Sequence, residues 1–185
     1  ILRRQLHRNF RKPLILMTPK SLLRHKLCVS NIEDFAEDSS FHRVSVDSAE
    51  TGASELALKP DAEIKRVVMC SGKVYYDLLE ERDARGLSDV YLLRIEQFYP
   101  FPALSLVKEL ERFKGAEMVW CQEEPKNQGA WTFVEPNLEW ALSKINAKHG
   151  RARYAGRAAS ASPATGLASR HKAEQEALIQ DALEG

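Results

Sequence analysis

Several kinds of functional site are missing from this sequence of 185 residues. Its three cysteines, Cys28, Cys70 and Cys121, lie far apart and form no C-x-x-C pair, so they predict neither a disulfide framework nor a zinc site and fit a reducing compartment. The five histidines include no close pair and no H-E-x-x-H motif. Because G-x-S-x-G and G-x-G-x-x-G are also absent, a self-contained hydrolase or dinucleotide enzyme is not indicated.

Long apolar runs and an excess of charge are absent as well. No apolar run approaches the roughly 18 residues that span a bilayer, and a net charge of +1 with 29% charged residues is that of an ordinary globular protein. The composition argues against a membrane protein and against a nucleic-acid partner. At this length the chain holds one domain with a real core and at most a short piece of a neighbour.

Acidic residues are absent from the first 32 residues, which carry eight lysines and arginines. This composition imitates a mitochondrial transit peptide. Since the first residue is Ile rather than Met, we favour a fragment in which Pro13–Met17 forms a buried strand. A helical turn over Lys20–His25, with Ser21 near its cap, is expected next.

Strand and helix patterns alternate after residue 40. The apolar spacing predicts strands over 41–47, 64–70, 89–95 and 116–121, and helices over 74–85, 102–113, 131–145 and 173–183. We expect Gly86 to end the first of these helices and Pro136 to end or kink the first turn of the third. The second should bury one face, formed by Leu104, Val107, Leu110 and Phe113. Strands separated by helices imply parallel pairing with both faces of the sheet covered, so the predicted class is α/β.

The turn Ser71-Gly72-Lys73 carries the strongest local chemical signal. A strand that passes through Ser-Gly directly into a helix exposes N–H groups, and Lys73 adds a positive charge that suits an anion such as phosphate. In the alternative interpretation Ser71 only caps the helix and Lys73 is solvated.

Two adjacent carboxylates, Glu123 and Glu124, follow a predicted strand in the stretch VWCQEEPKNQGAW. Neighbouring residues on an extended strand point in opposite directions, whereas acid–base catalysis needs two carboxyls that face one space. We therefore expect this pair to cap helix N–H groups or to bind cationic neighbours.

A basic stretch contains Arg151, Arg153 and Arg157. It either binds an acidic partner or a phosphate, or forms an exposed arm that packs on a neighbouring subunit. The small-residue segment ASASPATG within the following residues predicts a loop.

Five segments together resemble the carboxyl-terminal end of the 2-oxoglutarate dehydrogenases, the thiamine-diphosphate-dependent first subunits of the 2-oxoglutarate dehydrogenase complex. These segments are KPLILMTPKSLLRH, RVVMCSGKVYYDLLEER, RIEQFYPFP, WCQEEPKNQGAW and RYAGRAASASPATG. The resemblance implies a transketolase-type carboxyl-terminal domain, with a mainly parallel five-stranded sheet between helices. It assigns residues 1–25 to the end of a pyrimidine-binding domain, 26–62 to a linker with a short edge strand, and 63–185 to the carboxyl-terminal domain.

The resemblance also implies a parent enzyme of the citric acid cycle that uses thiamine diphosphate and magnesium, with the catalytic residues outside this fragment. No G-D-G motif is present to hold that cofactor, so none is expected here. The implied partners are the remainder of the subunit, a homodimer partner and the dihydrolipoyl succinyltransferase subunit. Bacterial cytoplasm is the preferred location, with the mitochondrial matrix as the eukaryotic equivalent.

Some relatives are regulated by acetyl-CoA, and the resemblance nominates Thr18, Lys73, Gln128 and Arg157 for such a site. The sequence departs from those relatives at Glu33, where they have arginine, and at Gly156-Arg157, where they have adjacent arginines. Three interpretations of the fragment therefore stay open: an assembly domain of the enzyme, a regulatory module for acetyl-CoA or a nucleotide, and an oligomerisation domain.

Overall fold

The computed structural model describes residues 1–184. Contacts within the chain divide it into two compact units, and the boundary lies between His42 and Arg43. No helix in the described residues combines the length and apolarity that a membrane span requires.

Residues 1–42 form a small unit with helix α1 (Leu2–His7) and two 3-10 helices, Lys20–Arg24 and Ile32–Phe35, none of which has a buried residue. The helical turn expected after residue 19 is confirmed, but no side chain caps it. The strand predicted over Pro13–Met17 is wrong, because these residues form no strand and all are exposed. An extended run needs a neighbouring strand for its backbone hydrogen bonds, and the described residues of this unit contain none.

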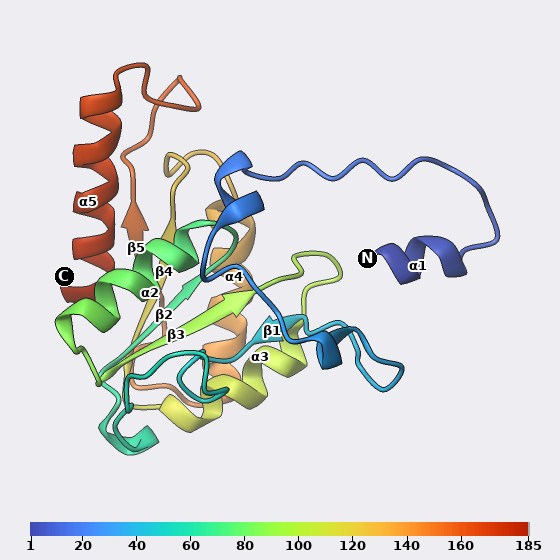
Figure 1. Cartoon of the computed structure of the whole chain (residues 1–185). Coiled ribbons are helices and arrows are strands. Elements are labelled where there is room, and N and C mark those ends of the chain that lie inside the picture. The colour runs from blue at the N-terminus through green and yellow to red at the C-terminus, as the bar shows by residue number, and fades with distance from the viewer. Residues whose placement is uncertain (185) are drawn as a thin grey trace. The chain divides into compact units, whose positions relative to one another are not determined.

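Residues 43–184 are built around a five-stranded sheet (Figure 1). Its strands are β1 (Val44–Ser45), β2 (Arg66–Cys70), β3 (Val90–Ile95), β4 (Glu117–Gln122) and β5 (Arg153–Gly156). They lie in the order β1-β3-β2-β4-β5; β1 is antiparallel to β3, and all other neighbours are parallel. The predicted α/β class with a mainly parallel five-stranded sheet is confirmed, as is the edge strand within residues 41–47.

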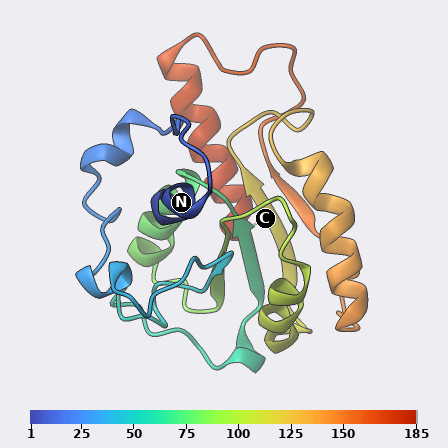
Figure 2. The ribbon, with the colours of Figure 1, turned by 90° about the vertical axis from the view of Figure 1, so that its right-hand side faces the viewer.

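Helices cover both faces of this sheet, as Figure 2 shows from the side. The α-helices are α2 (Val74–Arg85), α3 (Ala103–Leu110), α4 (Trp131–Lys144) and α5 (Ala168–Glu184), and 3-10 helices cover Asp61–Glu63 and Glu111–Phe113. Helices α2 and α5 pack on one face, over a cluster that includes Val68, Val119 and Ala155. Helices α3 and α4 pack on the other face, over Met69, Leu93 and Trp120. The strands alternate their side chains between two apolar cores, which is the pattern of a sheet buried on both sides.

Helix α2 begins and ends at the residues that the sequence predicts. Its amphipathic pattern runs from Val74 to Arg85, and Gly86 follows in the left-handed conformation with φ of 63°. A residue without Cβ adopts that conformation at little cost, so the helix ends there.

Three predictions for the later elements need correction. Leu104 is 80% exposed, whereas Leu106, Leu110 and Phe113 are buried. The buried row of α3 therefore starts at Leu106, and Leu104 lies two residues, or about 200° around the helix, away from it. The prediction that Pro136 ends or kinks the first turn of α4 is wrong for the ending, since the helix continues to Lys144. The residue four positions earlier, whose carbonyl loses its donor, is exposed to solvent. Helix α5 begins five residues earlier than predicted, at Ala168.

Candidate functional site

The carboxyl ends of β2 and β4 form the point at which the chain reverses its direction across the sheet. These two strands are parallel neighbours, but the connection after β2 leads to β3 on one side and the connection after β4 leads to β5 on the other. In open α/β sheets, ligands bind in the crevice at such a switch point. The residues just after the two strands, Ser71-Gly72-Lys73 and Glu123-Glu124, are therefore brought to the place where a site would be expected.

Lys73 is neutralised by two carboxylates of its own chain. Its Nζ lies 2.7 Å from Glu123 Oε1 and 3.0 Å from Asp77 Oδ2. Burial, the largest single effect, lowers the pKa of Lys73, but hydrogen bonds and attraction from the two carboxylates outweigh it and raise the pKa above its ordinary value. The interpretation in which Ser71 caps the helix and Lys73 is solvated is wrong, since no side chain caps α2 and Lys73 is paired with carboxylates.

The two adjacent glutamates serve different neighbours. The Glu123 carboxylate accepts from Lys73 and, at 3.0 Å, from Gln175 Nε2, while the side chain of Glu124 is exposed. The expectation that this pair binds cationic neighbours is confirmed for Glu123. The backbone carbonyl of Glu124 accepts a hydrogen bond from Tyr154 Oη at 3.1 Å, which ties the loop to β5.

Arg157 connects this cluster to helix α5. Its guanidinium donates to the backbone carbonyl of Glu123, to Gln175 Oε1 at 2.7 Å and to Glu174 Oε2 at 3.2 Å. Gln175 Nε2 in turn donates to Asp77 Oδ2 at 2.8 Å. Lys73 and Arg157, which were proposed as members of one site, therefore belong to one hydrogen-bonded network.

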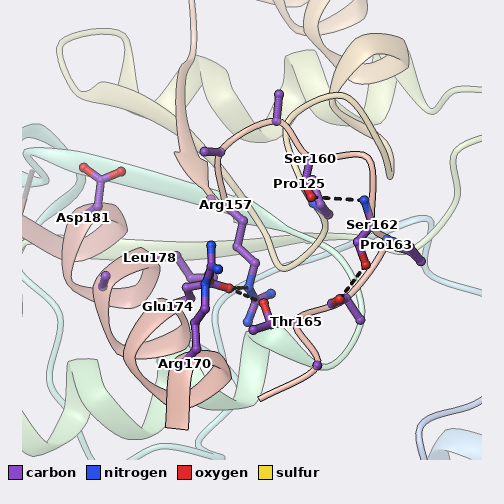
Figure 3. A pocket seen from close by; sticks show the side chains of 16 residues that line it. Pro125, Arg157, Ser160, Ser162, Pro163, Thr165, Arg170, Glu174, Leu178 and Asp181 are labelled. Atoms are coloured by element: carbon purple, nitrogen blue, oxygen red, sulfur yellow. Dashed lines mark hydrogen bonds and ion pairs between the residues drawn. The ribbon is translucent and has the colours of Figure 1, made fainter. Parts of the chain in front are cut away.

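A cavity of about 590 Å³ lies beside this network, between the loop after β5 and helix α5 (Figure 3). Arg157, Thr165 and Glu174 converge on one another at its wall, with Thr165 Oγ1 donating to Glu174 at 2.6 Å. Most of the remaining lining consists of small residues of the loop. The cavity thus carries a partly buried guanidinium beside a carboxylate that already pairs with it.

Gln128 is hydrogen-bonded to the loop after β5, which lines this cavity. Its Nε2 donates to the carbonyl of Ser160 at 3.0 Å, and Asn127 exchanges two hydrogen bonds with Ser160. Ser160 lines the cavity. Thr18, the fourth nominated residue, lies in the separate unit formed by residues 1–42.

The remaining arginines of the basic stretch are also paired. Arg151 contacts Glu139, and Arg153 lies 2.9 Å from Glu117 and 2.7 Å from Asp181. Arg153 is partly buried between its two carboxylates, whereas the Arg151 side chain is 76% exposed. In the described part of the chain no group of three His, Cys, Asp or Glu side chains is placed to hold a metal ion.

Sequence reasoning missed the contributions of α5 to this site. Glu174 and Gln175 were expected only to lie in a terminal helix, yet they supply three of the contacts around Arg157 and Glu123. One signal was available: Glu174 is the first acidic residue after a stretch from His149 to Ala173 that has none. The basic side chains of that stretch had to find carboxylates elsewhere, and Glu174 is the first that follows.

Known sequences match nearly the whole chain. The family described as 2-oxoglutarate dehydrogenase C-terminal matches residues 29–183. Two proteins named 2-oxoglutarate dehydrogenase E1 component, from Brucella anthropi and Brucella ovis, are 64% and 63% identical to the chain over 184 residues. These matches cover 99% of this chain and 18% of each relative. The chain therefore belongs to the 2-oxoglutarate dehydrogenase C-terminal family.

Proposed function

We propose that the chain is the carboxyl-terminal region of a 2-oxoglutarate dehydrogenase E1 component and that it serves assembly rather than chemistry. The parent subunit decarboxylates 2-oxoglutarate on thiamine diphosphate with magnesium in the citric acid cycle. It then passes the succinyl group to a lipoyl group of the dihydrolipoyl succinyltransferase subunit. The similarity to two proteins of that name over 184 residues supports this assignment.

The geometry of the switch point is the observation that carries the assembly role. A reacting acid or base must face the substrate with a free proton or lone pair. Here the side chains of Lys73, Glu123 and Arg157 are directed at one another and at α5. These contacts stabilise the carboxyl edge of the sheet and do not present a reactive group.

The described residues do not fit a site for magnesium and a diphosphate. No triad of potential metal ligands occurs among them, and two of the carboxylates at the switch point, Asp77 and Glu123, already bind Lys73. We therefore assign cofactor binding to other parts of the subunit. No catalytic step is assigned to this chain.

We further propose that residues 1–25 end a pyrimidine-binding domain, that 26–62 form a linker with the short edge strand β1, and that 63–185 form the assembly domain. The start of the family match at residue 29 supports a boundary in this region. The remainder of the subunit and a homodimer partner would contact the assembly domain. Bacterial cytoplasm is the proposed location, because the relatives are bacterial.

A chimera tests the assignment. The 184 matched residues of the Brucella anthropi relative would be replaced by this chain, and 2-oxoglutarate-dependent reduction of ferricyanide would be measured together with the molar mass in solution. We expect a dimeric chimera with turnover close to that of the unmodified relative, and no turnover by this chain alone. Turnover by the chain alone, or a dimeric chimera that is inactive, contradicts the proposal.

A substitution in the chimera separates assembly from chemistry. Loss of a general acid or base typically lowers kcat by about 100-fold or more, whereas loss of an assembly contact lowers stability and leaves the kcat of assembled protein unchanged. We expect the second result for Lys73→Met. Lys172→Met is the matched control, because Lys172 is 79% exposed on α5.

A regulatory anion site is a second candidate function, and one observation favours it. Arg157 and Arg170 both line the cavity, and Gln128 holds the loop that encloses it. We propose to titrate the chain calorimetrically with acetyl-CoA, using AMP and thiamine diphosphate as comparison ligands. Saturable acetyl-CoA binding that Arg157→Gln abolishes and Arg151→Gln retains supports this function; absence of heat for all ligands rejects it for this chain.

A further inference from the structure

Helix α5 is held to the sheet in two different ways along its length. Its carboxyl-terminal half buries Leu178, Ile179, Ala182 and Leu183 in the core that α2 and α5 form with one face of the sheet. From Ala168 to Ala177 no side chain is buried. Apolar burial therefore anchors only the second half of the helix.

Polar contacts alone hold the first half. Glu174 accepts a hydrogen bond from Arg157 at 3.2 Å, whereas its bonds from Thr165 and Arg170 lie within residues 158–177 themselves. Gln175 bonds to Arg157, Glu123 and Asp77. We call the contacts of Glu174 and Gln175 with Arg157, Asp77 and Glu123 the polar latch.

The two modes of attachment differ in strength and in their response to salt. A buried leucine or isoleucine contributes about 1.5–3 kcal/mol, while a solvent-accessible ion pair contributes about 0–1 kcal/mol and is screened by salt. Segments with exposed hydrogen bonds and little apolar burial open locally at lower free energy than the core. The first half of α5 has these properties, and the second half does not.

We propose that residues 158–177, which comprise the loop after β5 and the first half of α5, form a flap that opens as a unit while residues 178–184 stay packed. The flap forms one wall of the cavity, as Figure 3 shows, and in Figure 1 the start of α5 rises above the end of β5. Opening breaks the hydrogen bonds that join Ser160 to Asn127 and Gln128, and it uncovers the cavity. It also removes from the Arg157 guanidinium the three α5 side chains that contact it, those of His171, Glu174 and Gln175. In the closed state, the flap occupies the Arg157 guanidinium and so competes with any anionic ligand for it. This inference concerns a movement within the chain and does not depend on the proposed enzymatic parent.

Hydrogen exchange measured by mass spectrometry on the whole chain tests the flap. Peptides covering 168–177 should exchange faster than peptides covering 178–184, and raising the salt concentration should accelerate the first set alone. Gln175→Ala removes three contacts of the polar latch and should raise exchange in 168–177 by about tenfold, as expected for the loss of roughly one net hydrogen bond. Gln180→Ala, the same change five residues later on the same helix, should leave both sets unchanged.

Two results would overturn the flap. Equal exchange in the two halves of α5 at both salt concentrations means that the helix opens as a single element. Equal effects of Gln175→Ala and Gln180→Ala mean that the polar latch has no role. If Gln175→Ala raises exchange in β2 and β4 as well, the substitution has destabilised the whole domain. The salt dependence of exchange in the unmodified chain, in 168–177 compared with 178–184, is then the test of the flap.

Discussion

Gln122 organises the loop at the switch point with a single buried side chain. It is 4% exposed at the end of β4. Its Oε1 accepts from the backbone N–H of Trp131 and from Trp120 Nε1, both at 3.0 Å. Its Nε2 lies within hydrogen-bond distance of three loop carbonyls, the shortest being that of Gln128 at 2.8 Å. An amide is the side chain that offers both donors and an acceptor, so it serves the first N–H of α4 and the loop together.

Replacing this amide should therefore be costly. We expect Gln122→Ala to lower the free energy of unfolding by about 2–4 kcal/mol, because several buried polar groups lose their partner. Urea unfolding followed by tryptophan fluorescence measures the effect. Gln180→Ala, at an exposed position of α5, should change the free energy by less than about 0.5 kcal/mol, and a similar small change for Gln122→Ala would refute this role.

Gly129 and Gly86 provide a matched pair of substitutions. Both have positive φ, of 66° and 63°, but a Cβ at Gly86 meets nothing within 4 Å whereas a Cβ at Gly129 lies 2.9 Å from Glu124 Cβ. Alanine should cost about 1–2 kcal/mol at Gly86 for the backbone conformation alone and about 1–3 kcal/mol more at Gly129 for the clash. Equal losses in a denaturant titration would show that the loop relaxes freely.

The amino-terminal ends of the strands are joined by ion pairs centred on Glu117. Its carboxylate lies 2.7 Å from Arg66 on β2 and 2.9 Å from Arg153 on β5. Burial, the largest single effect, raises the pKa of Glu117, but hydrogen bonds from Arg153 and Arg66 outweigh it and lower the pKa below its ordinary value. The ionised form is thus favoured by folding, and it links three adjacent strands.

A depressed carboxyl pKa determines the sign of the pH dependence. Stability from Glu117 is fully present above its unfolded pKa of about 4.3 and is lost as the pH falls through its lower folded pKa. Glu117→Gln should therefore be less stable than the parent at pH 7, with a difference that shrinks below about pH 4.3. Urea unfolding at several pH values measures this, with Glu176→Gln, 68% exposed, as the control. A pH-independent difference would exclude ionisation as the cause.

At the scale of elements, sequence patterns predicted the segments that carry their own signals. Helix α2 has a breaker at each end and an apolar face between them, so its limits were predictable. Strand β5 was missed because only Ala155 of its four residues is buried, and its neighbours are basic or small. Leu104 and Leu106 are chemically equivalent, and the packing of α3 against the sheet decides which of them is buried.

The candidate site was predictable only in part, because some of its contacts depend on tertiary packing and have no local sequence signal. Lys73 and Glu123 follow strands whose carboxyl ends must meet at one edge, so local pattern and topology together place them near each other. Gln175 is 98 residues from Asp77, to which it bonds. No local pattern reports such a contact, since it depends on the angle at which α5 crosses the sheet.

At the scale of the whole molecule, thiol reactivity reports on folding. Cys28 is exposed, whereas Cys70 and Cys121 are buried on paired positions of β2 and β4. Burial raises the pKa of Cys70 to about 12 and that of Cys121 well above its ordinary value, so both remain unreactive thiols. We expect one thiol per native chain to react rapidly with a disulfide reagent, and all three in denaturant. Cys28→Ser should abolish the rapid phase; a second rapid thiol would contradict the packing of the sheet.

Helix α5 follows all five strands in the chain, yet it supplies Leu178, Ile179, Ala182 and Leu183 to one of the two cores. Helix α2 covers part of the same face, but on the ribosome the part beneath α5 stays uncovered until these four residues have been synthesised. Strand pairing and the α3–α4 layer can form before that step, so the nascent chain passes through a stage with one covered face and one face that α2 covers only in part. Synthesis of the last helix, rather than formation of the sheet, therefore sets the moment at which this domain becomes fully native.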